Sequence, residues 1–371
     1  MRKIFIITER RADYSRFQPI LKLIHEDEEL DYDLVVTGLH LKSEHGMTIN
    51  EINSDNFKIF STFEMFLEKN DTGAAMVRAY AEAVKQVSFI LERSKPDLIL
   101  SGFDIAANAA VTLAGAHMNI PVAHIQGGEV TGTIDESIRH SMSKFAHYHF
   151  AANDDACRRL IKLGELSDHV FDVGCPSIDA IMNVKIEEDL YKKFALSKPY
   201  LLMLQHPVTT EMKEANRQIQ STIDAVNASG LDTLVILPNN DAGYLSIMKQ
   251  INASNLKSVE TLSINDYVNL LRQAIGLIGN SSSGIHEAAS FNIPVVNIGT
   301  RQQGRLRPEN VIDVGHNTRE ILEAIRKCIK TKSKNLEYEN PYGDGNSAKK
   351  IIELLKTINL DDSILQKRIT Y

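Results

Sequence analysis

The sequence predicts an α/β protein made of two doubly wound domains. The chain has 371 residues, and a single hydrophobic core rarely serves more than roughly 250–300. Short apolar runs of strand length alternate with amphipathic helical stretches, as in parallel sheets whose strands are joined by crossover helices. This alternation occurs twice, so we place one Rossmann-like domain over residues 1–176 and a second over 177–371. The last helix is a candidate for packing back on the first domain.

The composition is that of an ordinary globular enzyme. Apolar residues make up 43% of the chain and charged residues 24%. The net charge of −7 argues against nucleic acid and acidic membrane surfaces as partners. The three cysteines are far apart and fit neither a disulfide framework nor a metal site, which favours the cytoplasm. We expect neither a signal peptide nor a membrane span, since no apolar run approaches about 20 residues.

In the first domain, β-rich runs and helical patterns follow one another in order. Strands are expected over residues 3–8, 32–38, 57–60, 97–104, 120–123, 147–152 and 170–176. Helices are expected through 21–24, over 73–92, 106–118 and 154–163, and after residue 133. Near residue 133, Thr133 and Glu136 stand at the spacing of a capping box, and Asp135 lies four residues before Arg139. Asp135 therefore has a purely structural interpretation as an acid favoured by the helix dipole.

In the second domain, the same alternation follows a charged helical connection over residues 177–199. Strands are expected over 200–207, 234–237, 276–279 and 294–298, and helices over 210–229, 318–330 and 347–358. The first of these strands ends in His206, which precedes Pro207. A residue before proline is restricted to extended backbone, so His206 stands at a rigid corner between strand and loop.

One loop of the first domain holds more ionisable groups than a turn needs. Residues 124–140 follow a predicted strand and contain three carboxylates, an arginine and two histidines besides three glycines. An open α/β sheet binds its ligand at the carboxyl ends of its strands. Candidate groups for proton transfer are Asp104, Glu129, Asp135 and His206.

The loops of the second domain suit a phosphorylated ligand. Residues 279–284 are glycines, serines and an asparagine at the start of a predicted helix, where backbone N–H groups and the helix dipole favour phosphate. The next loop adds Arg301 and Arg305, and arginine binds phosphate through two parallel hydrogen bonds. Asn239 and Asp241 lie in a further polar loop, after the strand over 234–237. Capping serines on a solvated surface are the alternative interpretation.

Other motifs narrow the chemistry. Arg10 and Arg11 stand before the first helix, where they suit an anion unless they form a merely solvated loop. The histidines of loop 39–50 lie at no zinc-ligand spacing from a cysteine. The sequence has no G-x-x-x-x-G-K-[ST] loop, no H-E-x-x-H and no G-x-G-x-x-G after the first strand. A nucleotide on the second domain and carboxylates on the first describe a nucleotide-sugar enzyme without a metal or a cofactor.

An ordered set of motifs resembles the hydrolysing UDP-N-acetylglucosamine 2-epimerases over nearly the whole chain. The motifs are Arg11-Ala12-Asp13-Tyr14-Ser15, Gly127-Gly128-Glu129, Asp135-Glu136-Ser137-Ile138-Arg139-His140, Gln205-His206-Pro207, Gly279-Asn280-Ser281-Ser282, Gly299-Thr300-Arg301-Gln302 and Tyr342-Gly343-Asp344-Gly345-Asn346. The chain is also similar to the epimerase half of the bifunctional epimerase/kinase of sialic acid synthesis.

The resemblance implies two Rossmann-like domains in the GT-B arrangement, with the ligand cleft between them and UDP mainly on the second. It implies a homodimer or homotetramer that converts UDP-N-acetylglucosamine to N-acetylmannosamine and UDP. In that family the C2 proton is removed, UDP is expelled to give 2-acetamidoglucal, and water then adds.

The resemblance also implies roles for individual residues. Asp104 and Asp135 match the acidic residues of the family, and His206 matches its cleft histidine. With Glu129 and Gln126, these are the expected catalytic residues. The expected UDP and substrate contacts are Arg11, Arg139, Asn239, Asp241, Asn280, Ser281, Ser282, Glu287 and Arg301, with Glu287 accepting the ribose hydroxyls and the serines donating to the diphosphate.

The sequence departs from the family at two positions. Ile105 follows Asp104 where the family usually has arginine, and Gln126 stands where the family commonly has glutamate. A glutamine can hydrogen-bond a sugar but cannot transfer a proton at neutral pH. Either Glu129 takes that role or the substrate is UDP-2,4-diacetamido-2,4,6-trideoxyglucose, a precursor of legionaminic acid. A GT-B glycosyltransferase and a non-catalytic UDP-sugar sensor are the remaining alternatives.

Overall fold

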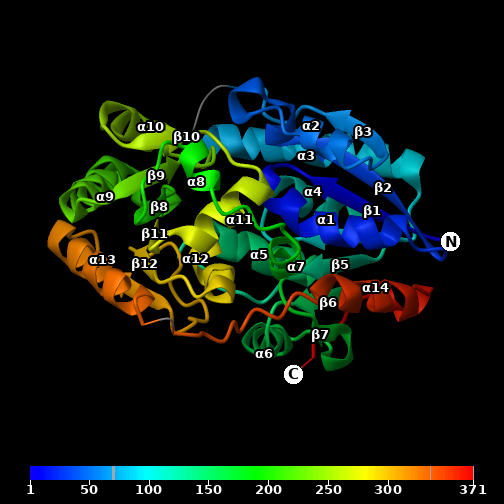
Figure 1. The fold of residues 1–371 in the computed structure, drawn as a ribbon. Coiled ribbons are helices and arrows are strands. Elements are labelled where there is room, and N and C mark those ends of the chain that lie inside the picture. Colours follow the sequence, from blue (N-terminus) through cyan, green and yellow to red (C-terminus); the bar gives the residue numbers. More distant parts are fainter. Residues whose placement is uncertain (69–71, 335, 371) are drawn as a thin grey trace. The chain divides into compact units, whose positions relative to one another are not determined.

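The computed structural model describes residues 1–68, 72–334 and 336–370, and the chain divides into two compact units (Figure 1). The first unit contains Met1–Glu129, Asp135–Ala180 and the chain from Tyr342 onward, and the second contains Val130–Ile134 and Ile181–Pro341. The segment that ends the chain therefore belongs to the first unit, and five residues of loop 124–140 belong to the second.

The first unit is built on a seven-stranded parallel sheet with the strand order β3-β2-β1-β4-β5-β6-β7. Its strands are β1 Arg2–Thr8, β2 Leu30–Thr37, β3 Ile59–Phe63, β4 Leu98–Gly102, β5 Val122–Ile125, β6 Tyr148–Ala151 and β7 Val170–Asp172. Its helices are α1 Arg11–His25, α2 Ile49–Ser54, α3 Gly73–Ser94, α4 Ala106–His117, α5 Ile134–Phe145, α6 Asp154–Lys162, α7 Pro176–Met182 and α14 Ser347–Thr357. The chain order reverses between β1 and β4, which is the point where such sheets bind ligands.

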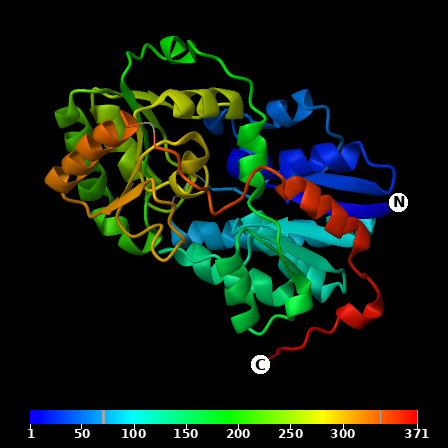
Figure 2. The ribbon, with the colours of Figure 1, turned by 60° about the horizontal axis from the view of Figure 1, so that its bottom comes forward.

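Helices cover both faces of this sheet. Alternate residues of β1 point to opposite faces, so Ile4 and Ile6 join the core beneath α1 and α14, while Phe5 and Ile7 join the core beneath α3 and α4. α14 packs against α1, and the two helices lie side by side in Figures 1 and 2. A strand that is buried on both faces reads as a continuous apolar run, which is why β1 was predictable.

The second unit is built on a six-stranded parallel sheet with the order β10-β9-β8-β11-β12-β13. Its strands are β8 Tyr200–Leu204, β9 Asp232–Ile236, β10 Lys257–Val259, β11 Gly276–Gly279, β12 Val295–Ile298 and β13 Val311–Val314. Its helices are α8 Leu190–Lys193, α9 Ala215–Ser229, α10 Tyr244–Ala253, α11 Ile264–Gln273, α12 Ser283–His286 and α13 Thr318–Lys332. Here the chain order reverses between β8 and β11.

The two doubly wound sheets confirm the predicted fold class, an α/β protein with two Rossmann-like units. Several elements differ from the sequence predictions. The helix predicted over 210–229 begins as the 3-10 turn Thr209–Glu214 and becomes α-helical only at Ala215. We did not predict α10, β10, α11 or β13. β10 has three residues, none of them fully buried, so it leaves no apolar run in the sequence.

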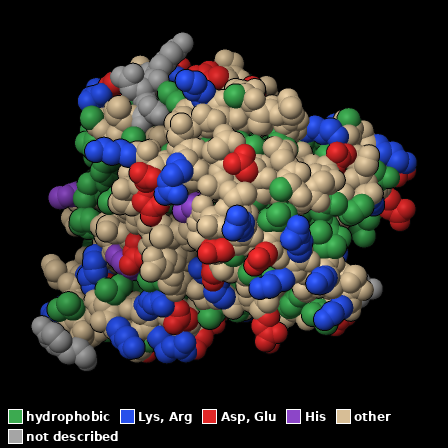
Figure 3. All heavy atoms as spheres, turned by 90° about the vertical axis from the view of Figure 1, so that its left-hand side faces the viewer, with side chains coloured by type: hydrophobic (Ala, Val, Ile, Leu, Met, Phe, Trp, Pro, Cys, Tyr) green, Lys and Arg blue, Asp and Glu red, His purple; other side chains and the backbone are tan. Residues whose placement is uncertain are grey.

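Within the described residues, no helix is both long enough and apolar enough to cross a membrane. On the face of the molecule in Figure 3, acidic and basic side chains are interspersed with apolar and polar ones.

Candidate active site

The predicted acidic residues of the first unit lie at the carboxyl ends of β4 and β5. Asp104 follows β4, and Gln126 and Glu129 follow β5. The two strands are parallel neighbours, and the N–H of Phe103 donates to the carbonyl of Ile125 at 2.9 Å. The structure therefore brings these strand ends together at the edge of the sheet where open α/β folds bind ligands.

A buried arginine of α5 joins these acids. The Arg139 side chain is 1% exposed, its guanidinium forms an ion pair with Asp104, and its Nη1 donates to the Glu129 carbonyl at 3.0 Å. Burial lowers the pKa of Arg139, but the charges of three carboxylates outweigh burial and raise it, Asp104 contributing most. The other two are Glu129 and Asp135. Arg139 is therefore a fixed cation among three predicted catalytic acids.

The spacing of Asp135 and Arg139 suggests a local pair on one helix face. In the structure, the guanidinium forms an ion pair with Asp104, 35 positions earlier in the chain, and the charge of Asp135 also acts on it. Asp135 lies in the first turn of α5 beside Glu136, which lies 3.8 Å from Nε2 of His140. Two neighbouring acids in one helical turn thus have different surroundings.

The Gln126 amide is held at both ends. Its Oε1 accepts from Nη1 of Arg16 at 3.1 Å, and its Nε2 donates to Oε1 of Glu129 at 3.0 Å. Arg16 also lies over the Phe103 ring, with Cζ 4.7 Å from the ring centroid. A glutamate at position 126 would face the Glu129 carboxylate at this distance, whereas the amide donates to it. We did not predict Arg16, because its partner lies 110 positions away and nothing local marks it.

Backbone strain marks the same edge of the sheet. Phe103 and Gln126 adopt left-handed conformations, with φ of +69° and +60°. A non-glycine residue in this region costs about 1–3 kcal/mol, and such strain concentrates at functional sites. Each strained residue directly follows its strand, so β4 and β5 both end in a conformation that the surrounding structure must maintain.

His124 has a structural role in this arrangement. Its Nε2 lies 3.0 Å from the Phe103 carbonyl, and its Nδ1 lies 3.1 Å from Oγ of Ser143 on α5. Burial lowers the pKa of His124 to about 3, so the ring is neutral at physiological pH. His124 therefore fastens the loop that carries Asp104 to the helix that carries Asp135.

Arg11, a predicted UDP contact, lies in the first turn of α1. Its Nε donates to Oε2 of Glu51 on α2 at 2.9 Å. The neighbouring Arg10 pairs at 2.6 Å with Glu9, a buried acid whose other oxygen accepts from the Ala107 N–H at 2.9 Å. Both arginines are thus partnered with carboxylates, so a phosphate would have to share them.

Two glycines of loop 124–140 are required by close packing. Gly128 has φ of +80°, and a Cβ there would lie 2.4 Å from the Ala156 carbonyl oxygen. A Cβ on Gly132 would lie 2.0 Å from the Thr300 carbonyl oxygen. These glycines, which the sequence suggested as part of a ligand loop, are explained by packing inside each unit.

In the second unit, Asn280 ties together the loops that follow three strands. Its Oδ1 accepts from the His206 N–H at 2.7 Å, and its Nδ2 donates to the His206 carbonyl at 2.8 Å. Its own carbonyl accepts from Arg301 at 3.2 Å and from Gln302 at 2.8 Å. The predicted residues after β8, β11 and β12 therefore converge on one asparagine side chain and its backbone.

His206 and Asn239 also meet. The Asn239 N–H lies 3.4 Å from Nδ1 of His206, which favours a neutral ring with its proton on Nε2. His206 is half-buried at the end of β8, in the second unit, while the predicted acids lie in the first.

The helix that follows the serine loop is short. After β11 the chain forms α12, a helix of four residues, followed by a 3-10 turn over Ala288–Phe291. Ser281 and Ser282 are partly exposed, and Glu287 is buried. Tyr267 of α11 hydrogen-bonds Ser283, and burial together with the Glu287 charge holds the pKa of Tyr267 well above its usual value. We missed Tyr267 because α11 was not predicted.

Arg301 and Asp241 approach each other, with Nη2 and Oδ2 separated by 4.0 Å. The Arg301 side chain is 14% exposed and is fixed by the Asn280 carbonyl. An arginine that is fixed in this way but still reaches solvent can receive a diphosphate.

Arg301→Ala is expected to weaken UDP binding by about 1–2 kcal/mol, roughly 5–30-fold, because a charged hydrogen bond is lost. Isothermal titration with UDP measures this. Arg307→Ala is the matched control, since Arg307 pairs with Asp313 on the same chain segment and should leave the affinity for UDP unchanged. An unchanged affinity in the Arg301 variant would contradict the predicted role.

Among the described residues, no cluster of histidine, cysteine, aspartate or glutamate has the arrangement of a metal site.

The family model described as UDP-N-acetylglucosamine 2-epimerase matches residues 22–356. The chain belongs to this family. The epimerase is 37% identical to UDP-N,N'-diacetylbacillosamine 2-epimerase (hydrolyzing) of Legionella pneumophila, over 99% of each chain. It is 34% identical to GDP/UDP-N,N'-diacetylbacillosamine 2-epimerase (hydrolyzing) of Campylobacter jejuni, over 84% of each. The predicted enzyme class, a UDP-sugar 2-epimerase, is thereby confirmed.

Solved structures agree with the fold of the epimerase. The UDP-GlcNAc 2-epimerase of Methanocaldococcus jannaschii, in complex with UDP-GlcNAc and UDP, has a TM-score of 0.81 at 18% identity and covers 95% of this chain and 99% of its own. The Neisseria meningitidis UDP-GlcNAc 2-epimerase bound to UDP-GlcNAc has a TM-score of 0.78 at 20% identity, with coverage of 95% and 99%.

Proposed function

We propose that this epimerase hydrolyses UDP-N-acetylglucosamine to N-acetylmannosamine and UDP. The observation that carries the proposal is the set of three predicted acids, Asp104, Glu129 and Asp135, around the buried Arg139 in a chain of this family. The reaction needs one group that removes a proton from carbon and one that returns a proton to the opposite face. Several carboxylates whose charges are fixed by a common cation supply such groups.

The proposed reaction has two steps. A carboxylate removes the proton from C2, the C1–O bond breaks, and its electron pair leaves with UDP to give 2-acetamidoglucal. Water then adds its hydroxyl to C1, and a proton is delivered to C2 on the other face. No electron is gained or lost overall, so the reaction requires no redox cofactor.

The second unit binds the nucleotide in this proposal. Ser281 and Ser282 donate to the diphosphate, Arg301 pairs with it, and Glu287 accepts the ribose hydroxyls. The support is the convergence of the loops after β8, β11 and β12 on Asn280, which fixes Arg301 and His206 before a ligand binds. Pre-fixed groups of this kind lower the entropic cost of binding.

Incubation with UDP-N-acetylglucosamine in heavy water tests the reaction. We expect stoichiometric release of UDP and one deuterium at C2 of the N-acetylmannosamine product. A glycosyltransferase would leave C2 protonated and require an acceptor, and a UDP-sugar sensor would bind UDP without turnover. Release of UDP without deuterium at C2 would rule out the proposed removal of the C2 proton.

UDP-2,4-diacetamido-2,4,6-trideoxyglucose is the second candidate substrate. Two observations favour it: Gln126 presents an amide between Arg16 and Glu129, and two hydrolysing relatives are named for the diacetylated sugar. Both substrates undergo the same reaction at C1 and C2. Measuring kcat/KM for the two UDP-sugars side by side decides between a role in sialic acid precursor synthesis and one in legionaminic acid precursor synthesis.

We also propose that the protein is a homodimer or homotetramer in the cytoplasm. Light scattering can test the oligomeric state.

A further inference from the structure

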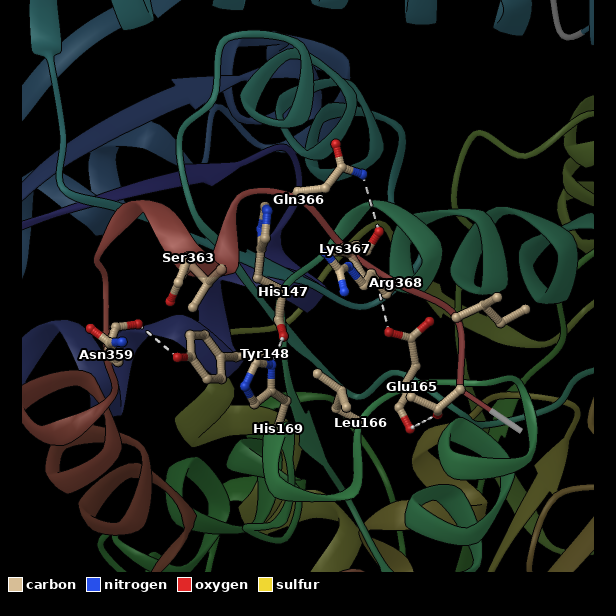
Figure 4. A pocket seen from close by; sticks show the side chains of 13 residues that line it. His147, Tyr148, Glu165, Leu166, His169, Asn359, Ser363, Gln366, Lys367 and Arg368 are labelled. Atoms are coloured by element: carbon tan, nitrogen blue, oxygen red, sulfur yellow. Dashed lines mark hydrogen bonds and ion pairs between the residues drawn. The ribbon is translucent and has the colours of Figure 1, made fainter.

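The segment that follows α14 crosses the amino-terminal ends of β6 and β7. Together with His147, Tyr148 and His169, it lines a cavity of about 590 Å³ (Figure 4). Tyr148 Oη donates to the Asn359 carbonyl at 2.6 Å, and the Thr370 N–H donates to the Gly164 carbonyl at 3.0 Å. The segment is therefore fastened on both sides of the cavity, on the opposite edge of the sheet from the candidate active site.

The approach of the segment depends on a glycine. Gly164 has φ of +87°, and a Cβ there would lie 2.4 Å from Cγ1 of Ile369. Only a residue without a side chain lets Ile369 and Thr370 come this close. The backbone at Gly164 and the terminal segment are therefore shaped for this contact.

Lys367 is the central contact of the segment. Its Nζ donates to Oε2 of Glu165 at 2.6 Å, to the Ser143 carbonyl at 2.9 Å and to the Lys144 carbonyl at 3.0 Å. An ammonium group has three N–H donors, and all three are used here. Ser143 and Lys144 lie in the last turn of α5, where carbonyls lack helical partners and the helix dipole favours a cation.

Glu165 receives hydrogen bonds from three elements. The carboxylate is 2% exposed and accepts from Lys144 of α5 at 2.7 Å, His149 of β6 at 2.9 Å and Lys367. Burial raises the pKa of Glu165, but these partners outweigh burial and lower it to about 2. The group is therefore ionised at neutral pH, and it ties the end of α5 to the sheet and to the terminal segment.

The same helix carries the residues of the candidate site. Asp135, Arg139 and Ser143 are spaced by four, so they lie along one face of α5. Arg139 pairs with Asp104, and Ser143 Oγ lies 3.1 Å from the His124 ring that contacts the Phe103 carbonyl. A helix of 12 residues is a rod about 18 Å long, so a displacement at one end moves the groups at the other.

We propose that residues 366–370 form a latch that fixes the position of α5, and that Lys367 is a positioning residue for the reaction at Asp135 and Arg139. The expected loss of kcat rests on the proposed function, whereas the expected change in hydrogen exchange in α5 does not. Lys367 is distant in sequence from every predicted site residue and touches none of their reacting groups. It acts through the last turn of the helix that presents them.

Lys367→Met is expected to lower kcat about 10–100-fold, as small displacements of catalytic groups do, with the affinity for UDP unchanged. Amide hydrogen exchange in the last turn of α5 should become faster. Lys367→Arg should recover most of the activity because it retains the cation. Arg368→Met is the matched control, since Arg368 is an exposed cation next in the chain, and it should change neither readout.

A double variant separates positioning from stability. Glu165→Gln with Lys367→Met removes both charges, so the unfolding transition should return toward that of the wild type while the α5 carbonyls still lack their cation. Persistently low kcat in this variant supports the latch, and recovery of kcat together with stability overturns it. If the wild type turns over neither UDP-sugar, the proposed function fails. The latch is then tested by hydrogen exchange alone. An unchanged exchange rate in the last turn of α5 in Lys367→Met would disprove it.

Discussion

Asp135→Asn is expected to lower kcat by about 10²–10⁴-fold, the usual contribution of a general acid or base. An amide of the same shape cannot accept the C2 proton at neutral pH. UDP affinity should stay nearly unchanged, because most of the predicted nucleotide contacts lie in the second unit. Steady-state kinetics with UDP-N-acetylglucosamine and titration with UDP measure the two quantities separately.

Glu136→Gln is the control for this variant. Glu136 occupies the same first turn of α5 and lies near His140, so it has the same interaction with the helix dipole. Turnover close to that of the wild type is expected. Should Asp135→Asn reduce turnover and UDP binding equally, or should both variants behave alike, Asp135 would be only a helix-start acid.

The edge of the sheet where the site lies could be predicted from the sequence, but the ion pairs and hydrogen bonds within the site could not. Asp104 and Glu129 follow apolar runs, and parallel strands of a doubly wound sheet end at one edge, so their proximity follows from the pattern. The spacing of Asp135 and Arg139 suggests a local pair, but nothing in the sequence indicates the ion pair that Arg139 forms with Asp104. Partners that are far apart in the chain become apparent only when the strand order is known.

In the second unit, too, the ligand loops could be predicted from their composition, whereas the hydrogen-bond partners could not. The serine and arginine loops were found from their composition, because few purposes other than a phosphate need so many donors at a strand end. Asn280 was expected to contact the ligand, and its hydrogen bonds to His206 also fix the protein loops around it. Tyr267 gave no comparable signal, because it lies on a helix that we did not predict.

Gln126 illustrates how the structure changes an interpretation. From the sequence it is the place where an expected acid is missing. In the structure its amide donates to Glu129 and accepts from Arg16, so it bridges a carboxylate and a guanidinium. A neutral residue can do this without adding a second negative charge 3.0 Å from the first. This arrangement suits Glu129 to the role that the sequence left open.

Arg139→Met is expected to reduce the free energy of unfolding by about 3–5 kcal/mol, because removing one partner of a buried ion pair leaves the other charges uncompensated. Turnover should be lost as well, since the carboxylates around Arg139 would then repel one another. Urea denaturation and kinetics of UDP release measure the two effects. Arg139→Lys retains a charge but loses the fork of donors, so part of the stability should return without the activity.

A second substitution shows whether the loss comes from the unpaired charge. In Asp104→Asn/Arg139→Met both partners are neutral, and replacing both members of a buried pair is often nearly neutral for stability. The double variant should therefore be more stable than Arg139→Met alone, with a coupling that a double-mutant cycle quantifies, and it should remain inactive. Additive losses would mean that Arg139 contributes to stability through packing rather than through its ion pair with Asp104.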